Sequence, residues 1–267
     1  MPYKNIFDSH AHYDDPAFAP DREALLASLP GRGVCGVVDC GSDLASSEKA
    51  LALSAAYPYV YAAAGIHPEE VEALPADWEE RLGALLSRPK IVAVGEIGLD
   101  YHFKEGAPRE KQKAVFERQL AMANGRNLPV VVHDRDAHGD TLEILKKWKP
   151  AGEVHCFSGS VETAREILAL GMYLGLGGAV TFKNAREPVE VARMVPDDRL
   201  LLETDCPYMS PVPFRGRRND STRIAYTAER IAAIRGTDPQ SLIDRARRNA
   251  ETLFRTGGVS PPPRPAV

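Results

Sequence analysis

Histidine and carboxylate side chains stand at the ends of separate apolar segments that are spread over most of this chain. One histidine follows three valines and one glutamate follows IVAVG, at points where a buried strand should emerge into a loop. Imidazole nitrogen and carboxylate oxygen bind divalent metals, and a buried ionised carboxylate needs a partner of this kind. The set therefore predicts a metal centre, with hydrolysis as its chemistry, held by His10, His12, Glu96, His133, His155 and Asp205.

Two metal ions account for this ligand set better than one. Four histidines and two carboxylates exceed what one tetrahedral site requires, whereas two ions roughly 3.5–4 Å apart would use all of them. Glu96 is the expected bridge, because a carboxylate has two oxygens that can bind separate ions. The mixed nitrogen and oxygen ligands suit Zn²⁺, Mn²⁺, Ni²⁺ or Mg²⁺ to differing degrees.

Only a fold that gathers many strand ends could bring these residues together. Short apolar runs alternate with longer amphipathic stretches along the 267 residues, which predicts βαβ units, and eight such repeats favour a closed (β/α)₈ TIM barrel. Strands are predicted at 5–11, 34–40, 60–65, 91–96, 129–133, 153–157, 172–176 and 200–205. Helices are predicted at 21–30, 44–57, 77–88, 109–127, 138–148, 160–170, 187–194 and 222–235.

The end of the chain predicts one extra C-terminal helix beyond the barrel. Asp238 is a suitable N-cap and Pro239 suits the first helical position of a helix at 239–254. Residues 1–256 are then expected to form one hydrolase barrel domain, and the proline-rich residues 257–267 to be a disordered tail.

Composition narrows the function classes. The formal net charge of −4 gives no overall basic field, so a polyanionic substrate would have to be attracted locally. None of the four cysteines forms a C-x-x-C pair, which argues against a zinc finger. Because neither a signal peptide nor a run of membrane-spanning length is visible, the chain is expected in the cytoplasm, and no obligatory protein partner is evident.

In their order and joint presence, six motifs of this chain resemble the TatD family of metal-dependent deoxyribonucleases, within the amidohydrolase-like barrels. The resemblance runs from residue 7 to about 211, and the helical C-terminus fits as well, so nearly the whole chain is covered. The family often carries an R-N-x-P segment after the last strand, where this chain reads FRGRRNDST without the proline. The matching motifs are FDSHAHYDD, AAAGIHPEE, VAVGEIGLDYH, LPVVVHDRDAHGDTL, VHCFSGS and LLETDCPYMSP.

This resemblance implies a (β/α)₈ barrel, divalent metals and phosphodiester hydrolysis, often 3′→5′ trimming of single-stranded DNA. DNA, as single strands or 3′ ends, is then the expected substrate. The resemblance also implies the ligands named above, with His10, His12 and Asp205 completing one metal site and His133 and His155 completing the other.

Further roles come with the resemblance. It adds His67 in GIHP as a residue that contacts substrate phosphate, and Glu203 as a functional carboxylate. Asp205 is placed to accept the proton of the attacking water as general base, and Glu203, two residues earlier and facing the same way, to orient a ligand. Cationic side chains that could attract phosphate are Arg135, Lys183, Arg215, Arg217 and Arg218.

Four residues near the ligands are interpreted as structural. Strand alternation turns Cys156 and Cys206 away from the barrel axis, as small packing residues facing the helix layer. Asp8 lies one step deeper in the barrel than the first histidine and is expected to form buried hydrogen bonds. Asp100 is expected to anchor its own loop.

Two other functions compete with the nuclease at this point. The same activated water could cleave an amide, ester or acyl-tRNA bond, as amidohydrolases do. Amidohydrolases of the dihydroorotase type usually bridge their metals with a carboxylated lysine on strand four, where this chain has Glu96, and this difference favours the nuclease. A non-catalytic metal-binding or adaptor protein would be favoured if a ligand were missing, and none is.

Overall fold

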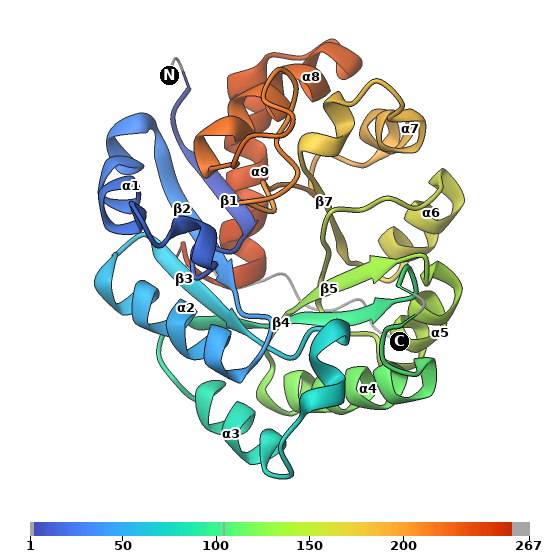
Figure 1. The fold of residues 1–267 in the computed structure, drawn as a ribbon. Helices are drawn as coiled ribbons and strands as arrows, with labels where there is room; N and C mark the ends of the chain where they lie inside the picture. The colour runs from blue at the N-terminus through green and yellow to red at the C-terminus, as the bar shows by residue number, and fades with distance from the viewer. Residues whose placement is uncertain (1–2, 104, 258–267) are drawn as a thin grey trace.

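Eight parallel strands form a single sheet in which each strand pairs with the next, in the order β1 to β8 (Figure 1). The computed structural model describes residues 3–103 and 105–257. This architecture confirms the predicted (β/α)₈ barrel. The strands are β1 (Ile6–Ala11), β2 (Val34–Cys40), β3 (Val60–Ala64), β4 (Ile91–Asp100), β5 (Val130–Arg135), β6 (Gly152–Val154), β7 (Tyr173–Leu176) and β8 (Leu200–Leu202).

Helices surround the strands, as the alternating pattern predicted (Figure 1). The α-helices are α1 (Arg22–Ser28), α2 (Leu44–Ala56), α3 (Trp78–Leu85), α4 (Arg109–Arg126), α5 (His138–Trp148), α6 (Val161–Ala169), α7 (Arg186–Met194), α8 (Ile224–Arg235) and α9 (Pro239–Phe254). Short 3₁₀ helices are η1 (Pro16–Phe18), η2 (Pro30–Arg32), η3 (Pro68–Ala73), η4 (Gly178–Thr181) and η5 (Ser221–Arg223).

Side-chain caps explain where several helices begin. The Asp238 carboxylate accepts a hydrogen bond from the Ser241 amide at 2.8 Å, so α9 begins at Pro239 as predicted. The Asp43 carboxylate caps α2 through the Ser46 amide at 2.6 Å. These local contacts satisfy backbone donors that have no partner inside the helix.

The barrel closes between its first and last strands through one bridge. Ala11 at the end of β1 pairs in parallel with Cys206, which lies beyond β8. The Asp205 amide donates to the His10 carbonyl at 3.0 Å, and the His12 amide donates to the Cys206 carbonyl at 2.8 Å. The closure therefore falls beside three of the predicted ligands.

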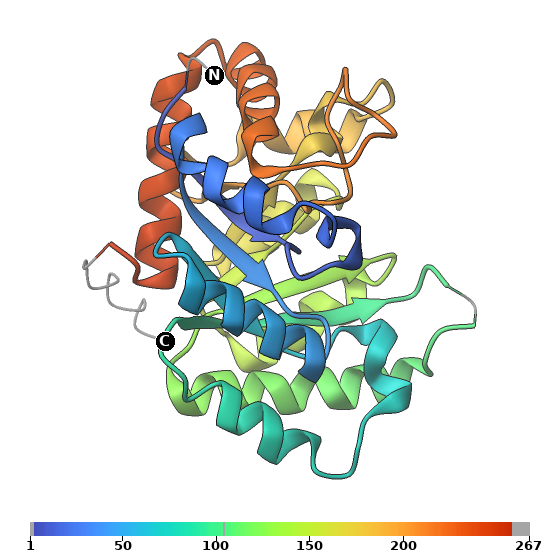
Figure 2. The ribbon, with the colours of Figure 1, turned by 60° about the vertical axis from the view of Figure 1, so that its left-hand side comes forward.

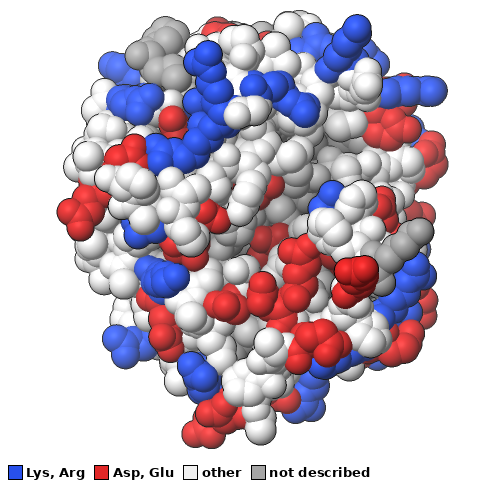
Figure 3. Space-filling view, in the orientation of Figure 1, with Lys and Arg blue, Asp and Glu red and all other residues white. Residues whose placement is uncertain are grey.

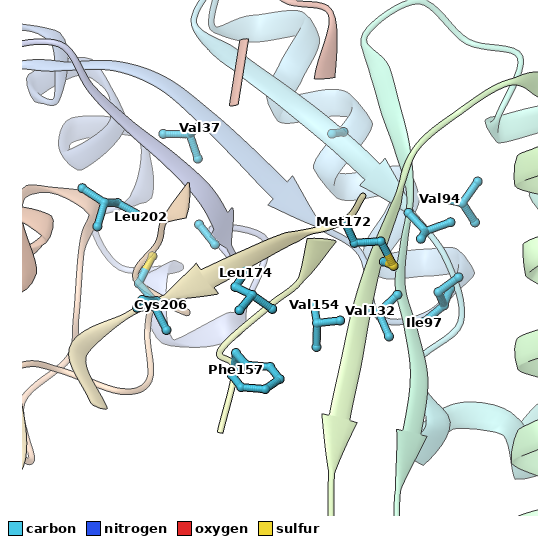
Figure 4. Close-up of a cluster of buried hydrophobic side chains, with 14 of the residues drawn as sticks. Val37, Val94, Ile97, Val132, Val154, Phe157, Met172, Leu174, Leu202 and Cys206 are labelled. Atoms are coloured by element: carbon cyan, nitrogen blue, oxygen red, sulfur yellow. The ribbon is translucent and has the colours of Figure 1, made fainter. Parts of the chain in front are cut away.

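The core lies mainly between the strands and the helix layer (Figure 4). Val37, Val94, Val132 and Leu202, from four different strands, are buried with residues of the surrounding helices. A second buried cluster joins strand residues to the end of α9, where the Phe254 ring stacks on Phe7 with centroids 6.4 Å apart. The extra helix is thus part of the packed domain.

Five strands end at other residues than predicted. β3 ends at Ala64 and β5 at Arg135, within two residues of the prediction, and three others differ by more. β4 continues to Asp100, whereas β6 ends at Val154 and β8 at Leu202. Cys156 and Asp205 have positive φ angles of 43° and 56°, so the backbone has left the extended conformation there. Strand alternation therefore does not apply to Cys156. This residue lines the cleft above the predicted ligands, so the prediction that it faces the helix layer was wrong.

The two longest loops of the barrel rim lie on one side of the molecule (Figure 2). One follows β4 and the other joins β8 to η5, and both project from the side at which the strands end. In the described ranges, no helix combines the length and the apolar character needed to cross a membrane. Most of the predicted proline-rich tail, from residue 258 onward, lies outside the described residues.

Candidate metal centre and its cleft

The predicted ligands converge at the carboxyl ends of the strands. The Nε2 atoms of His10 and His12 lie 2.9 Å apart, and Glu96 Oε2 is 3.4 Å from each of them. Asp205 Oδ1 lies 3.6 Å from His10 Nε2 and 3.4 Å from His12 Nε2. Four donor groups, from β1 and the residue after it, from β4 and from the segment after β8, therefore face one point.

The other carboxylate oxygen of Glu96 faces a different pair of imidazoles. Glu96 Oε1 lies 2.8 Å from His133 Nδ1 and 2.7 Å from His155 Nε2. His67 Nε2 is 3.5 Å from the same oxygen. Glu96 thus stands between two groups of nitrogen donors, in the position that a bridging ligand would need.

The donor chemistry fits divalent cations. Donor atoms in each of three sets lie within 4.8 Å of one another. These nitrogen and carboxylate donors belong to largely buried side chains, which exclude competing water. One set joins His155 to His10 and Asp205, and the rings of His10 and His155 stack with centroids 3.8 Å apart. The sets are His10, His12 and Glu96; His10, His155 and Asp205; and His67, Glu96 and His133.

Burial and proximity shift the pKa values of these groups in opposite directions. Burial, with the charge of His155 beside it, lowers the pKa of His10 to about 4. Burial opposes protonation of His12 as well, but the hydrogen bond with Asp205 and the charge of Glu96 raise its pKa to about 10. Burial alone would raise the pKa of Glu96, yet the neighbouring histidines hold it well below its usual range. Glu96 is therefore ionised and ready to bind cations.

Asp100 joins the site in a way that the sequence reasoning missed. Its Oδ1 accepts a hydrogen bond from the His102 amide at 2.8 Å, which anchors the loop as predicted. Its Oδ2, however, lies 3.0 Å from His133 Nε2 and orients that ring. The sequence did carry a signal for this contact. Glu96 and Asp100 are four residues apart on one long strand, so their side chains point to the same face.

Glu203 lies behind the donors and is fully buried. Its Oε1 accepts a hydrogen bond from the Cys156 amide at 2.7 Å and lies 3.9 Å from His155 Nδ1. Gly175 leaves room for it, since a Cβ there would collide with Glu203 Oε2. This position supports the loop that carries His155.

His67 and Asp8 occupy distinct places. His67 caps η3, where its Nδ1 accepts a hydrogen bond from the Glu69 amide at 3.2 Å, so the proton of a neutral ring is on Nε2, the atom that faces the centre. Asp8 is buried and accepts hydrogen bonds from the hydroxyls of Thr204 at 2.6 Å and Ser221 at 2.7 Å, as predicted.

A cleft of about 780 Å³ opens above the donors. Nine carboxylate residues line this histidine cleft, against two basic residues, Lys49 and Arg135. Figure 3 shows acidic side chains around the hollow in the centre of this face. Lys183 is exposed and is not among the residues that line the cleft. Arg218 lies outside it and binds Asp21 with both ends of its guanidinium, at 2.6 and 2.7 Å.

Comparison with known proteins identifies the family. The model of the family described as TatD related DNase matches residues 7–255. A Bacillus subtilis protein described as the uncharacterized metal-dependent hydrolase YabD is 39% identical over 253 residues, covering 94% of this chain and 99% of that protein. The 3′-5′ ssDNA/RNA exonuclease TatD of Salmonella typhimurium is 34% identical over 257 residues, covering 93% of this chain and 98% of that protein.

Solved structures agree with this assignment. The crystal structure of YjjV, a TatD homologue from Escherichia coli K12, matches with a TM-score of 0.88 and 33% sequence identity, and covers 94% of this chain and 98% of that chain. An Escherichia coli phosphotriesterase homology protein, with a TM-score of 0.68 and 16% identity, shares the fold. The chain therefore belongs to the TatD related DNase family and is a metal-dependent hydrolase of that nuclease family.

Proposed function

We propose that this protein hydrolyses phosphodiester bonds of DNA at a binuclear metal centre, as a 3′-5′ exonuclease that prefers single-stranded DNA. The observation that carries the proposal is the position of Glu96, whose two oxygens face two different imidazole groups. The similarity to a 3′-5′ ssDNA/RNA exonuclease supports the polarity and the substrate class. A lysine bridge of the dihydroorotase type would need a lysine where Glu96 stands.

The proposed ligands are those predicted from the sequence. His10, His12 and Asp205 would hold one ion, and His133 and His155 the other, with Glu96 between them. Bound divalent cations would supply Lewis acidity, by acidifying a water molecule and by neutralising charge on the phosphate. Zn²⁺, Mn²⁺, Ni²⁺ and Mg²⁺ are the candidates.

The protein's own residues would position the substrate and move the proton. Asp205 is ionised, since the hydrogen bond with His12 and the neighbouring histidines outweigh its burial and lower its pKa, and its carboxylate would accept the proton of the attacking water. His67 Nε2 would donate a hydrogen bond to the phosphate. Glu203 would keep the His155 loop in place. Arg135, at the wall of the cleft, would attract phosphate.

The test combines metal analysis with nuclease assays. Wild-type protein should contain about two divalent ions per chain and degrade single-stranded DNA from the 3′ end, and chelation should abolish this activity. Asp205→Asn should lower kcat by roughly 10²- to 10⁴-fold, the range for loss of a general base. Asp198→Asn, at a carboxylate that is 73% exposed and does not line the cleft, is the control and should keep kcat.

Two results would contradict the proposal. An Asp205→Asn protein that kept full activity with metal bound would show that Asp205 is not the general base. A metal-loaded wild-type protein that cleaved acylated amide or ester substrates but no DNA would favour the amidohydrolase-type alternative. Cytoplasmic residence also stays a proposal, and fractionation of cells would test it.

A further inference from the structure

A second pocket of about 460 Å³ adjoins the histidine cleft and has the opposite electrostatic character. This arginine pocket is lined by Phe182, Tyr208, Met209, Arg215, Arg217 and Arg218, among others, and none of its lining residues is acidic. Tyr208 and Met209 line both cavities, so the two lie side by side on either side of these residues. A ligand that emerges from the histidine cleft over Tyr208 therefore enters the arginine pocket.

We propose that the arginine pocket binds the nucleotide on the 5′ side of the scissile phosphate, with its base stacked on Tyr208 and its own phosphate held by Arg215 and Arg217. The proposal rests on the proposed nuclease function and deepens it, because it states how the rest of a strand is held while its 3′ end is cleaved.

Tyr208 has the geometry of a stacking platform. Its side chain is exposed, at 55%, although it is a large aromatic residue. Its hydroxyl donates a hydrogen bond to Asp15 at 2.8 Å, which fixes one end of the ring. The ring centroid lies 6.4 Å from that of His12, at the edge of the donor cluster. An unpaired base stacks on such a ring without regard to sequence.

The cations beside Tyr208 differ in their availability. Arg215 and Arg217 are exposed, and neither forms an ion pair with another residue that the structure describes. The Arg215 guanidinium lies 3.7 Å from the centre of the Phe182 ring, which orients it without neutralising its charge. Arg218 is already paired with Asp21. The free charges are therefore those of Arg215 and Arg217.

The loop that carries these residues is held in shape before any ligand binds. The Ser210 hydroxyl donates to the Arg217 carbonyl at 2.6 Å, and Arg223 donates to the Ser210 hydroxyl at 2.7 Å. Asn219 donates to the carbonyls of Thr204 at 3.0 Å and of Tyr208 at 2.8 Å. Such preorganisation reduces the entropy lost on binding.

Charge then sets the direction of the strand. The part of the histidine cleft formed by the start of α2 and by η3 carries Asp43, Glu69 and Glu70, which repel a phosphodiester chain. Figure 3 shows basic side chains gathered at the edge of this face where the β8–η5 loop lies, and acidic ones around the hollow. The rest of the strand is therefore drawn over Tyr208, and only the terminal nucleotide occupies the acidic side.

The experiment compares two substrates. A single-stranded DNA oligonucleotide reaches both cavities, whereas thymidine 5′-(p-nitrophenyl phosphate) offers one phosphodiester and nothing beyond it. For Tyr208→Ala and for the double variant Arg215→Gln/Arg217→Gln, KM for the oligonucleotide should rise about 5- to 100-fold. The kcat/KM for the small ester should change less than about 2-fold. In Tyr208→Phe, KM for the oligonucleotide should stay close to the wild-type value, because the ring remains.

Salt dependence gives a second readout. Loss of the contact with this one phosphate in Arg215→Gln/Arg217→Gln should reduce the slope of log K against log salt by about 0.7 for a single strand. Fluorescence anisotropy of a labelled oligonucleotide measures the slope in the Asp205→Asn background, where cleavage is slowed. Arg186→Gln on α7, whose side chain is 82% exposed, is the matched control and should leave the slope unchanged.

The outcomes separate the two proposals. Equal losses on both substrates, or unchanged KM and salt slope for the oligonucleotide, would overturn the arginine-pocket proposal while the nuclease function stood. If wild-type protein cleaved neither substrate with metal present, the proposed function itself would fail.

Discussion

At the scale of single residues, the site shows that positioning groups matter as much as the donors. Asp100 and Glu203 are not among the proposed metal ligands, yet each lies beside a histidine that is. Asp100 Oδ2 is 3.0 Å from His133 Nε2, and Glu203 Oε1 is 3.9 Å from His155 Nδ1. A ligand histidine that is held by a carboxylate keeps its ring orientation and is a better donor. Loss of such a partner should therefore weaken metal binding without removing a ligand.

Asp100→Asn should lower metal affinity about 10- to 100-fold, because an amide accepts a weaker hydrogen bond from the His133 ring than a carboxylate does. Titration of the metal-free protein with Zn²⁺, followed by calorimetry, measures this change. Asp136→Asn is the matched control, since this exposed carboxylate pairs with His102 on the surface. Equal affinities for wild type and Asp100→Asn would contradict the positioning role.

The ion pair between His138 and Asp134 should make the stability of the folded protein depend on pH. The hydrogen bond with the buried Asp134 carboxylate, at 2.7 Å, raises the pKa of His138 above 6.5 in the folded protein. A raised folded-state pKa stabilises the fold fully below the unfolded pKa, and the stabilisation is lost as pH rises through the folded pKa.

The Tm difference between wild type and His138→Gln should therefore be largest near about pH 5 and shrink toward about pH 9. Calorimetric scans of both proteins across this range measure it, and taking the difference cancels effects common to both. Because the side chain is 34% exposed, solvent screening keeps the effect small. A difference that grew with pH would contradict this account.

At the scale of elements, the ends of strands and helices carry the chemistry and some of the stability. The Lys90 ammonium, just before β4, shares its three N–H groups among four carbonyls, at 2.6 Å from Ser54, 2.9 Å from Tyr57, 3.1 Å from Pro58 and 2.8 Å from Val60. These carbonyls lie at the end of α2 and in the turn into β3. One cation thus holds the junction between two βα units.

Lys90→Met should destabilise the protein by about 1–3 kcal/mol, because carbonyls that the ammonium satisfied lose a charged donor. Urea unfolding measures the change. Lys146→Met is the control, since its ion pair with Glu166 has both side chains about half exposed, at 50% and 51%, and should contribute roughly 0–1 kcal/mol. Similar losses for both variants would show that the junction has no special role.

At the scale of the whole molecule, the proposed metals would join distant parts of the barrel. The donor residues come from β1, β4 and β5 and from the segments after β6 and β8, and the barrel closes between β1 and the segment after β8 through a single bridge, Ala11 to Cys206. Ligation at this end would connect both sides of the closure. Binding to the folded state alone would stabilise it.

Removal of the metals should therefore lower Tm. At a free metal concentration of about 100 times Kd, the stabilisation is about 2.7 kcal/mol for one ion. Scanning calorimetry before and after chelation measures the loss, and adding back Zn²⁺ or Mn²⁺ should restore it. An unchanged Tm in protein shown to bind metal would mean that the closure does not depend on the ions.

The sequence alone determined the barrel, the order of its strands and the donor residues that converge at one end. These follow from local properties, because apolar runs alternate with amphipathic stretches and strand ends of a parallel barrel meet at one face. Only the tertiary structure decided that Asp100 faces His133, that Cys156 lines the cleft and that Arg218 is paired with Asp21. These depend on where each strand ends and on contacts between residues far apart in the chain, which no local pattern encodes.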